Sequence, residues 1–284
     1  MKISTQTARL GERFGDKKAV QMLCDIGFDA IDYSMFQFLS EGHILNSDGY
    51  RQHVTELRKI AEGNGVYFNQ THAPFPSYIK NDEEYNKKIL PALVRSIEIT
   101  AILGAKDVVI HPVAVKENQK EFNIALYNSL LPYAKEYGVR IALENMFGWD
   151  PVKNMLIENV CSREKEFNDY LDALDRDYFI ACLDIGHCGL IGGYAPDMIR
   201  ALGHDRLKSL HVHDNDNISD LHTLPFTQRL NWIEIMSALK DISYDGELTF
   251  EADNFLTNFP DELMFQATTL ILETGKHLVS LFEG

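Results

Sequence analysis

The stretch FIACLDIGH, residues 179–187, is a short apolar segment that runs into an aspartate and a histidine. Seven further segments rich in β-branched and apolar residues recur along the 284 residues, at an average spacing of about 35 residues, which is the length of one strand plus one helix. The eight segments are 3–7, 30–35, 66–72, 107–111, 140–144, 179–184, 207–213 and 247–251. Strands that alternate with helices in this way predict parallel strand–helix–strand units.

Longer stretches with the periodicity of amphipathic helices lie between these segments. In the stretch 48–61, Val54, Leu57 and Ile60 share one helical face, and Gly63 follows as a stop signal. The other helical stretches are 85–103, 122–137, 232–239 and 263–281. Eight units without a flexible linker predict an α/β fold, a (β/α)8 TIM barrel formed as a single domain by residues 1–284. The competing fold is an open doubly wound sheet, but the chain lacks its G-x-G-x-x-G turn after an early strand.

Six successive strand segments end in a side chain that can bind a metal ion or transfer a proton. In chain order these residues are His72, His111, Glu144, Asp184, His211 and Glu251. The carboxyl ends of barrel strands meet at one rim, where TIM-barrel enzymes have their active sites. A single such residue is most often a solvated or capping side chain, whereas six at successive strand ends predict a functional site.

Side-chain alternation along the strands predicts that Glu144, Asp184 and Glu251 point into the barrel. Their large apolar neighbours, expected to point outward, are Leu143, Leu183 and Phe250. Three converging carboxylates repel one another unless they share protons or bind a cation. With His211 as a nitrogen ligand beside them, we expect a divalent metal ion, and this mixed ligand set suits Mn²⁺, Co²⁺, Fe²⁺ or Zn²⁺ better than Ca²⁺.

The composition excludes several classes of protein. The 27 Lys and Arg residues against 42 Asp and Glu residues give a net charge of −15, which disfavours a broad surface for nucleic acid or anionic lipid. Four cysteines without a C-x-x-C pair form neither a disulfide framework nor a zinc knuckle. The N-terminal residues MKISTQTARLGERFG lack the apolar region of a signal peptide, and no segment approaches the ~18 apolar residues of a membrane span. We therefore expect a cytoplasmic protein with no membrane partner.

The motifs LEN (143–145), LDIGH (183–187) and HVHDNDNISDLHTLP (211–225) resemble those of the xylose isomerase-like TIM barrel superfamily. This superfamily contains sugar isomerases and epimerases and also the three-zinc apurinic-site endonucleases, and the resemblance covers essentially the whole chain. In its sugar-isomerase members, the residues matching Glu144, Asp184, His211 and Glu251 bind one divalent metal ion. The resemblance also implies that Glu144 and Glu251 are the catalytic acid/base pair and that His187 contacts the substrate.

The resemblance implies an isomerase or epimerase whose partner is a small carbohydrate, a sugar or keto-polyol. Such an enzyme works by proton transfer through a metal-stabilised enediolate, with Mn, Co or Zn as the cofactor. One glutamate would remove the proton from carbon and the other would return it. Homo-oligomerisation of the chain stays open.

Several positions bear on the choice of substrate. We also expect His72, His111 and Asp150 to contact it; Asp150 lies six residues after Glu144, where ketose 3-epimerases have a glutamate. Asn217 stands where those epimerases have an arginine, and Phe226 and Gln228 replace two glycines of the sugar-enzyme loop pattern. His213, two residues after His211 on the same face, receives no assigned role.

Three other functions share this pattern. Nine residues match the ligands of the three-zinc endonuclease cluster, so the sites of additional metal ions would include His72, His111, His187, Asp220 and His222. Against a nuclease, DNA binding needs Arg- and Lys-rich rim loops, and the loop MFQFLSEGHILNSDGY (35–50) contains neither residue. An inosose-like keto-polyol dehydratase would begin with the same proton abstraction. A non-catalytic sugar-binding subunit is disfavoured because a binder needs no pair of opposed bases.

Overall fold

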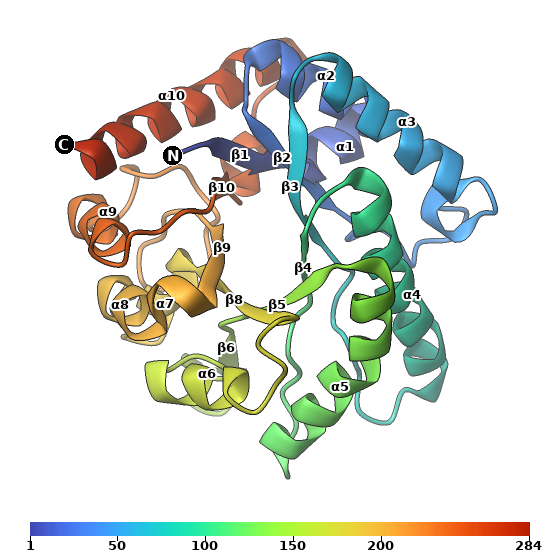
Figure 1. Ribbon diagram of the computed structural model, residues 1–284. Helices are drawn as coiled ribbons and strands as arrows, with labels where there is room; N and C mark the ends of the chain where they lie inside the picture. Colours follow the sequence, from blue (N-terminus) through green and yellow to red (C-terminus); the bar gives the residue numbers. More distant parts are fainter.

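The computed structural model describes residues 1–284 and confirms the predicted (β/α)8 TIM barrel, with eight parallel strands surrounded by helices (Figure 1). The strands follow one another around the barrel in the order β10-β1-β2-β3-β4-β5-β8-β9. Backbone hydrogen bonds from Val212 N to Thr249 O (2.9 Å) and from Glu251 N to Val212 O (3.1 Å) join β9 to β10 and close the ring. The barrel strands are β1 (Ile3–Gln6), β2 (Ala30–Ser34), β3 (Tyr67–His72), β4 (Asp107–Val109), β5 (Arg140–Glu144), β8 (Phe179–Asp184), β9 (Leu207–His211) and β10 (Leu248–Phe250).

Ten α-helices and three short 3₁₀ helices complete the chain. The α-helices are α1 (Ala8–Phe14), α2 (Asp16–Ile26), α3 (Tyr50–Gly63), α4 (Glu83–Leu103), α5 (Gln119–Tyr137), α6 (Glu164–Leu171), α7 (Ile185–Leu190), α8 (Ala195–Arg206), α9 (Trp232–Asp241) and α10 (Met264–Glu283). The 3₁₀ helices are η1 (Ile44–Asn46), η2 (Asp253–Leu256) and η3 (Asp261–Leu263). None of the helices combines the length and the apolar character that crossing a bilayer requires.

Each barrel strand coincides with one predicted segment, and α3, α4, α5, α9 and α10 coincide with the predicted helical stretches. The other five helices had no predicted counterpart. Of these, α1, α6 and α7 have only seven, eight and six residues, too few to show a helical period. The strands β4 and β9 end earlier than predicted, at Val109 and His211, because the chain leaves the ladder for the rim loops there.

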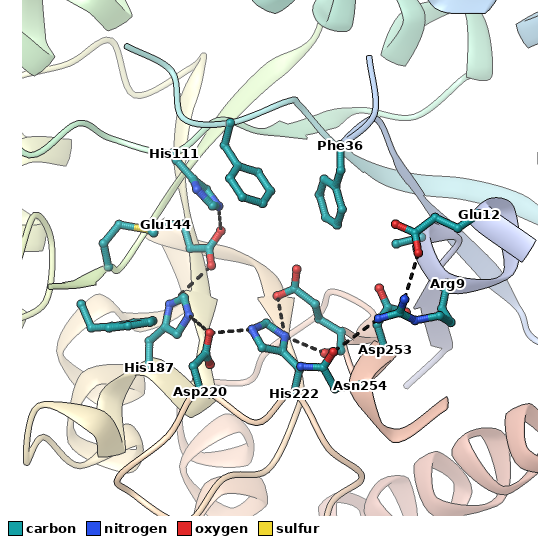
Figure 2. Close-up of a pocket in the computed structure, with 15 residues that line it drawn as sticks. Arg9, Glu12, Phe36, His111, Glu144, His187, Asp220, His222, Asp253 and Asn254 are labelled. Atoms are coloured by element: carbon teal, nitrogen blue, oxygen red, sulfur yellow. Dashed lines mark hydrogen bonds and ion pairs between the residues drawn. The ribbon is translucent and has the colours of Figure 1, made fainter. Parts of the chain in front are cut away.

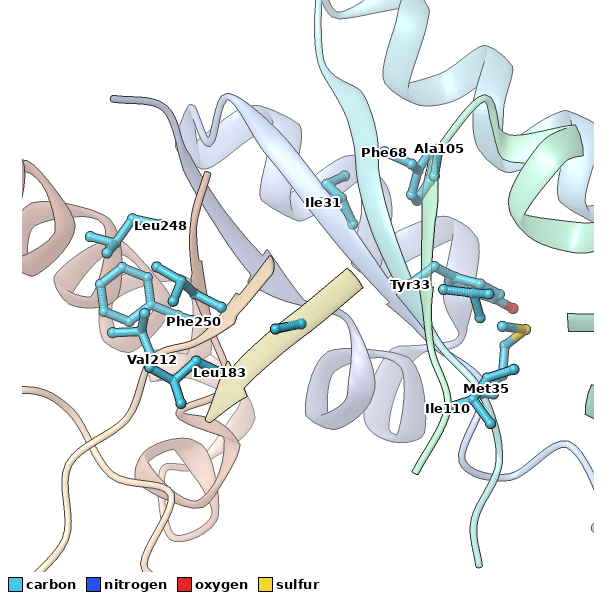
Figure 3. Packing of buried hydrophobic residues seen from close by; sticks show 14 of the residues in the cluster. Ile31, Tyr33, Met35, Phe68, Ala105, Ile110, Leu183, Val212, Leu248 and Phe250 are labelled. Carbon is cyan, nitrogen blue, oxygen red and sulfur yellow. The ribbon is translucent and has the colours of Figure 1, made fainter. Parts of the chain in front are cut away.

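The apolar residues of the strands divide between two cores. The outward-facing side chains, including Leu143, Leu183 and Phe250, are fully buried in the main core between strands and helices, as predicted (Figure 3). Burial of each such side chain stabilises the fold by about 1.5–3 kcal/mol. A second, small cluster fills the barrel interior with Val109, Ala142, Ile180 and Cys182. Ala142 precedes Glu144 by two positions on β5, so both side chains point into the barrel. The interior cluster therefore packs directly beneath the rim residues.

An antiparallel hairpin, which was not predicted, follows β5 and is formed by β6 (Phe147–Asp150) and β7 (Met155–Glu158). Its turn exposes Val152, and Trp149 and Met155 are half exposed. Met146 and Phe147, at the start of the hairpin, line the main cavity of the barrel rim. The hairpin therefore supplies one wall of the candidate site.

Candidate functional site

The carboxyl ends of the strands bring nine of the ten predicted site residues to one place. Their nitrogen and oxygen atoms form overlapping groups, and within each group these atoms lie within 4.8 Å of one another. The nine residues are His72, His111, Glu144, Asp184, His187, His211, Asp220, His222 and Glu251. The tenth, Asp150, lies outside these groups on the hairpin.

The central group consists of Glu144, Asp184, His211 and Glu251, which are the four residues predicted to hold a metal ion. Nδ1 of His211 lies 3.3 Å from Oε1 of Glu144 and 3.0 Å from Oε2 of Glu251. Asp184 and His211 are fully buried, and the other two side chains are at most 8% exposed. Three buried carboxylates around one imidazole nitrogen are a ligand set of high negative charge.

A second group extends the central one toward β3 and β4. Nε2 of His111 lies 2.9 Å from Oε2 of Glu144 and 3.0 Å from Nε2 of His72. The other ring nitrogen of His72, Nδ1, lies 2.8 Å from the carbonyl oxygen of Ala73, which accepts its proton and fixes the ring. Nε2 of His72 and of His111 therefore both face Glu144.

A third group lies on the opposite side of the central one and contains His187, His213, Asp220 and His222. Nε2 of His222 lies 2.9 Å from Oδ2 of Asp220, and Nε2 of His187 lies 3.7 Å from the same oxygen (Figure 2). Nε2 of His213 lies 2.9 Å from Oδ1 of Asp184, which links this group to the centre. The sequence motif 211–225 thus supplies His211 to the central group and three of the four residues of the third group.

His213 belongs to the site, although the sequence assigned it no role. It is fully buried, and its ring stacks on that of His222 with centroids 4.0 Å apart. Gly186 makes room for it, because a Cβ at that position would lie 2.1 Å from Cε1 of His213. The glycine of the LDIGH motif therefore allows the helix α7 to approach the histidine closely.

The residues present fit a divalent cation. Several buried polar atoms of the cluster have no hydrogen-bond partner, and leaving such atoms unpaired costs about 1–3 kcal/mol each. They are Oε2 of Glu144, Nδ1 and Nε2 of His211, Nδ1 of His213 and Oδ1 of Asp220. A cation in the central group would satisfy Oε2 of Glu144 and Nδ1 of His211, while Nε2 of His211 keeps the proton of the neutral ring, and the mixed His/Asp/Glu set is the kind that first-row transition metals prefer.

The charges of the cluster depend on one another. Burial alone would raise the pKa of Glu144, but His211 and His111 outweigh burial and hold that pKa well below its usual range. Burial likewise disfavours a charged His187, yet Asp184 and Asp220 outweigh it and raise the pKa of His187 to about 10. The Glu144 carboxylate is therefore stabilised in its ionised form and attracts positive charge, which is the property a cation site needs.

A cavity of about 370 Å³ opens directly onto the cluster (Figure 2). Glu144, His187 and Glu251 form its floor, while Phe36 and Phe75 contribute apolar surface. Its far wall is polar and comes from α1 and from the segment after β10, with Arg9, Glu12, Asp253 and Asn254. The cavity thus combines a metal-capable floor, aromatic sides and a polar end wall.

Two residues inside the barrel that the sequence analysis missed support the cluster from below. Gln6 on β1 donates a 2.7 Å hydrogen bond from Nε2 to Oε1 of Glu251. Asp32 on β2 is fully buried, and its Oδ2 lies 3.7 Å from Nε2 of His211. Gln6 is the last residue of β1, but it is an amide, and Asp32 lies in the middle of β2, so the rule that found the other six strand-end residues selects neither of them.

Asp150 is the predicted residue that the structure does not bring to the cavity. Its Oδ1 accepts hydrogen bonds from the backbone nitrogens of Val152 (2.9 Å) and Lys153 (3.1 Å), and its Oδ2 lies 3.6 Å from Nζ of Lys153. In this position Asp150 stabilises the turn of the hairpin. The expectation of a substrate contact came from its spacing after Glu144, and the hairpin turns that position away.

Two proteins of known sequence are similar to this chain over most of its length. An uncharacterised protein of Methanocaldococcus jannaschii is 26% identical over 247 residues, 83% of this chain and 78% of that protein. A D-psicose 3-epimerase of Enterocloster bolteae is 24% identical over 257 residues, 84% of this chain and 78% of the enzyme.

Solved structures share the fold at low identity. A D-tagatose 3-epimerase-like protein superposes with a TM-score of 0.74 at 20% identity, covering 99% of each chain. The IOLI protein with a bound zinc atom superposes with a TM-score of 0.73 at 18% identity, covering 99% of this chain and 98% of that one. The model of the xylose isomerase-like TIM barrel family matches residues 20–269. The chain therefore belongs to the xylose isomerase-like TIM barrel family.

Proposed function

We propose that the protein is a divalent-metal-dependent sugar isomerase or epimerase that transfers a proton at a carbon next to a carbonyl group. The observation that carries this proposal is the placement of Glu144 and Glu251. Both carboxylates line the same cavity, and both lie against Nδ1 of His211 although they come from separate strands, β5 and β10. The sugar epimerases among the relatives and structural neighbours support the same class of reaction.

Glu144, Asp184, His211 and Glu251 would hold the metal ion, and Mn²⁺, Co²⁺ or Zn²⁺ suits these ligands. When bound, the ion would polarise the carbonyl and neighbouring hydroxyl oxygens of the sugar and make the adjacent C–H bond more acidic. The zinc atom in the IOLI structure supports a metal in this fold without identifying the one used here.

The two glutamates divide the proton transfer between them. One glutamate, as the carboxylate, removes the proton from the carbon and leaves an enediolate. The other, which begins the step as the carboxylic acid, gives its proton to the opposite face in an epimerisation or to the neighbouring carbon in an isomerisation, so the two residues exchange protonation states. His187, also at the cavity floor, is placed to hydrogen-bond a substrate oxygen. Phe36 and Phe75 line the same space, and a bound sugar that displaces water against these rings would make the carboxylate a stronger base toward carbon.

The polar end wall is suited to hydroxyl groups. Nη1 of Arg9 lies 2.9 Å from Oε2 of Glu12, Nη2 lies 3.5 Å from Oδ1 of Asn254, and Nε is buried without a partner. A hydroxyl both donates and accepts hydrogen bonds, so it can bond with the arginine and with the carboxylate or amide oxygens beside it. Because Glu12 balances the charge of Arg9, the wall suits the uncharged end of a sugar better than a phosphate group.

We expect Arg9→Met to raise KM for the sugar about tenfold while kcat changes little, because a hydrogen bond from a charged group far from the reacting carbon adds about 1.5–3 kcal/mol to binding. Steady-state kinetics on the substrate measure this. Arg58→Met is the matched control, since Arg58 also pairs with a glutamate of its own helix, Glu62, but lies on the outside of α3. A fall in kcat at constant KM would contradict the assignment of Arg9 to substrate binding.

A second candidate function, a three-metal nuclease, is favoured by one observation. The three groups of ligands around Glu144 and Asp184 comprise all nine positions that match the three-zinc endonuclease cluster. A nuclease would bind about three metal ions per chain and cleave an oligonucleotide with an abasic site, whereas the proposed isomerase would bind about one and leave the oligonucleotide intact. The net charge of −15 favours the sugar enzyme.

The proposed function is tested by incubating the metal-loaded protein with a panel of ketoses and keto-polyols in D₂O. We expect deuterium at the carbon next to the carbonyl of one sugar, together with a new isomer or epimer. A product lighter by one water molecule would identify a keto-polyol dehydratase, which shares the first proton abstraction. No exchange with any member of the panel would contradict the proposal.

A further inference from the structure

We infer that Asp32 is a positioning residue for the metal site: its carboxylate, behind His211, holds that imidazole with Nδ1 directed at the metal ligands. This inference rests on the proposed metal site and adds a residue that lies outside the ligand set. The contact joins Oδ2 of Asp32 to Nε2 of His211 at 3.7 Å, while Nδ1 of the same ring faces Glu144 and Glu251. The ring is therefore placed between one carboxylate behind it and two in front.

The burial of Asp32 shows that this carboxylate is not a solvated surface charge. The residue has no exposed surface, and its only ion-pair partner is His211. Its one hydrogen bond comes from Nε2 of Gln70, 3.0 Å from Oδ2, and its Oδ1 is buried with no partner. A carboxyl group buried so completely needs polar partners that offset its desolvation, and besides Gln70 the fold places the ring of His211 beside it.

The strand register brings Asp32 to this position. Asp32 is paired with Gln6 of β1 and Gln70 of β3, so the three side chains form a polar layer inside the barrel beneath the cluster. His211 reaches the same interior from β9, where it is paired with Asp184. Gln6 supports Glu251 from this layer, and Gln70 supports Asp32. The layer thus contacts the ligand set from the side opposite the cavity.

Charge explains how Asp32 acts on the ring. At 3.7 Å the contact is electrostatic rather than a hydrogen bond. A negative charge beside Nε2 favours a proton on that nitrogen, which leaves the lone pair of Nδ1 free for a cation. Carboxylates behind metal-binding histidines usually accept a hydrogen bond from the ring, and their removal lowers metal affinity by about 10- to 100-fold. Asp32 occupies the same place behind His211 at a longer distance.

The experiment titrates metal-free protein with Co²⁺ and follows its visible absorption bands, which report both affinity and coordination without any sugar. We expect Asp32→Asn to weaken Co²⁺ binding about 10- to 100-fold. The asparagine keeps the shape and the oxygen that accepts from Gln70, so the metal-free variant should melt close to the wild type. Asp32→Ser provides a second variant with the same expected loss, and Asp32→Glu, which restores the charge, should recover most of the affinity.

The matched control is Asp107→Asn, which removes another buried carboxylate. Asp107 is the first residue of β4, at the end of the barrel opposite the cluster, and its Oδ1 lies 2.6 Å from Nε of Arg140. Its replacement should lower thermal stability and leave Co²⁺ affinity unchanged. Two results would overturn the role of Asp32 without affecting the proposed function. One is a Co²⁺ affinity of Asp32→Asn equal to that of the wild type, and the other is a loss of Co²⁺ affinity in Asp107→Asn as large as that in Asp32→Asn. A wild-type protein that binds no Co²⁺ would overturn the metal site of the proposed function and this inference with it.

Discussion

Glu144→Gln and Glu251→Gln should each lower turnover of the sugar by about 100- to 10,000-fold, the range that a positioned acid or base contributes to a reaction. Each glutamine keeps the size of the side chain but cannot accept the proton from carbon. Each change also removes one carboxylate that faces His211, so metal affinity should fall at the same time. Turnover is therefore measured at saturating metal, which separates the loss of the base from the loss of the ligand.

Glu98→Gln is the control for these two substitutions. Glu98 is largely buried and binds Tyr50 and Arg51, but it lies on the outer helix α4 and not in the cavity. Its replacement should leave kcat within about twofold of the wild type, because Glu98 contacts neither the cavity nor the metal-capable cluster. Full turnover by both Glu144→Gln and Glu251→Gln would show that the carboxylate pair is not the acid and base.

Removing the metal should abolish activity and lower thermal stability together. Treatment with a chelator is expected to give inactive protein, and one of Mn²⁺, Co²⁺ or Zn²⁺ should restore turnover. A ligand that binds only the folded chain stabilises it by about 2.7 kcal/mol at a concentration 100 times its Kd, so the melting temperature should rise as metal is added back. Activity and melting curves measured on the same samples check both effects.

Metal analysis of the purified protein gives the stoichiometry. About one ion per chain agrees with the four central ligands, whereas about three would favour the nuclease function, since the surrounding histidines would then also be ligands. Full activity in protein stripped of metal would contradict the part assigned to Glu144, Asp184, His211 and Glu251 in holding a cofactor.

The metal-capable residues were predictable from local sequence because the fold repeats one local rule. Parallel strands of a barrel all end at the same rim, so residues such as His72 and Glu251, which are far apart in the chain, meet without any further information. The alternation of Leu143 and Glu144 on β5 also fixed which side chain faces the interior, and the structure confirms it. Periodicity was sufficient for these strand-end residues, whereas His187, Asp220 and His222 were implied by the resemblance to the family.

The walls of the cavity could not be predicted in the same way. Arg9 belongs to a helix of seven residues, and Asn254 belongs to a 3₁₀ helix; neither has a periodic signal, and their contact joins residues from the two ends of the chain. The position of Asp150 outside the cavity has a related cause, since its spacing after Glu144 matched a pattern while the unpredicted hairpin set its direction. Loop geometry depends on tertiary packing, and spacing in the sequence carries little information about it.

The most direct test of the proton-transfer function is the rate at which the protein exchanges a sugar C–H for deuterium in D₂O, measured with and without metal. The wild-type protein with Mn²⁺, Co²⁺ or Zn²⁺ should place deuterium at the carbon beside the carbonyl of its substrate. Stripping the metal, or replacing Glu144 or Glu251 by glutamine, should remove that exchange. The proton-transfer function would be contradicted if the protein exchanged no proton in any ketose or keto-polyol and instead cleaved an abasic oligonucleotide.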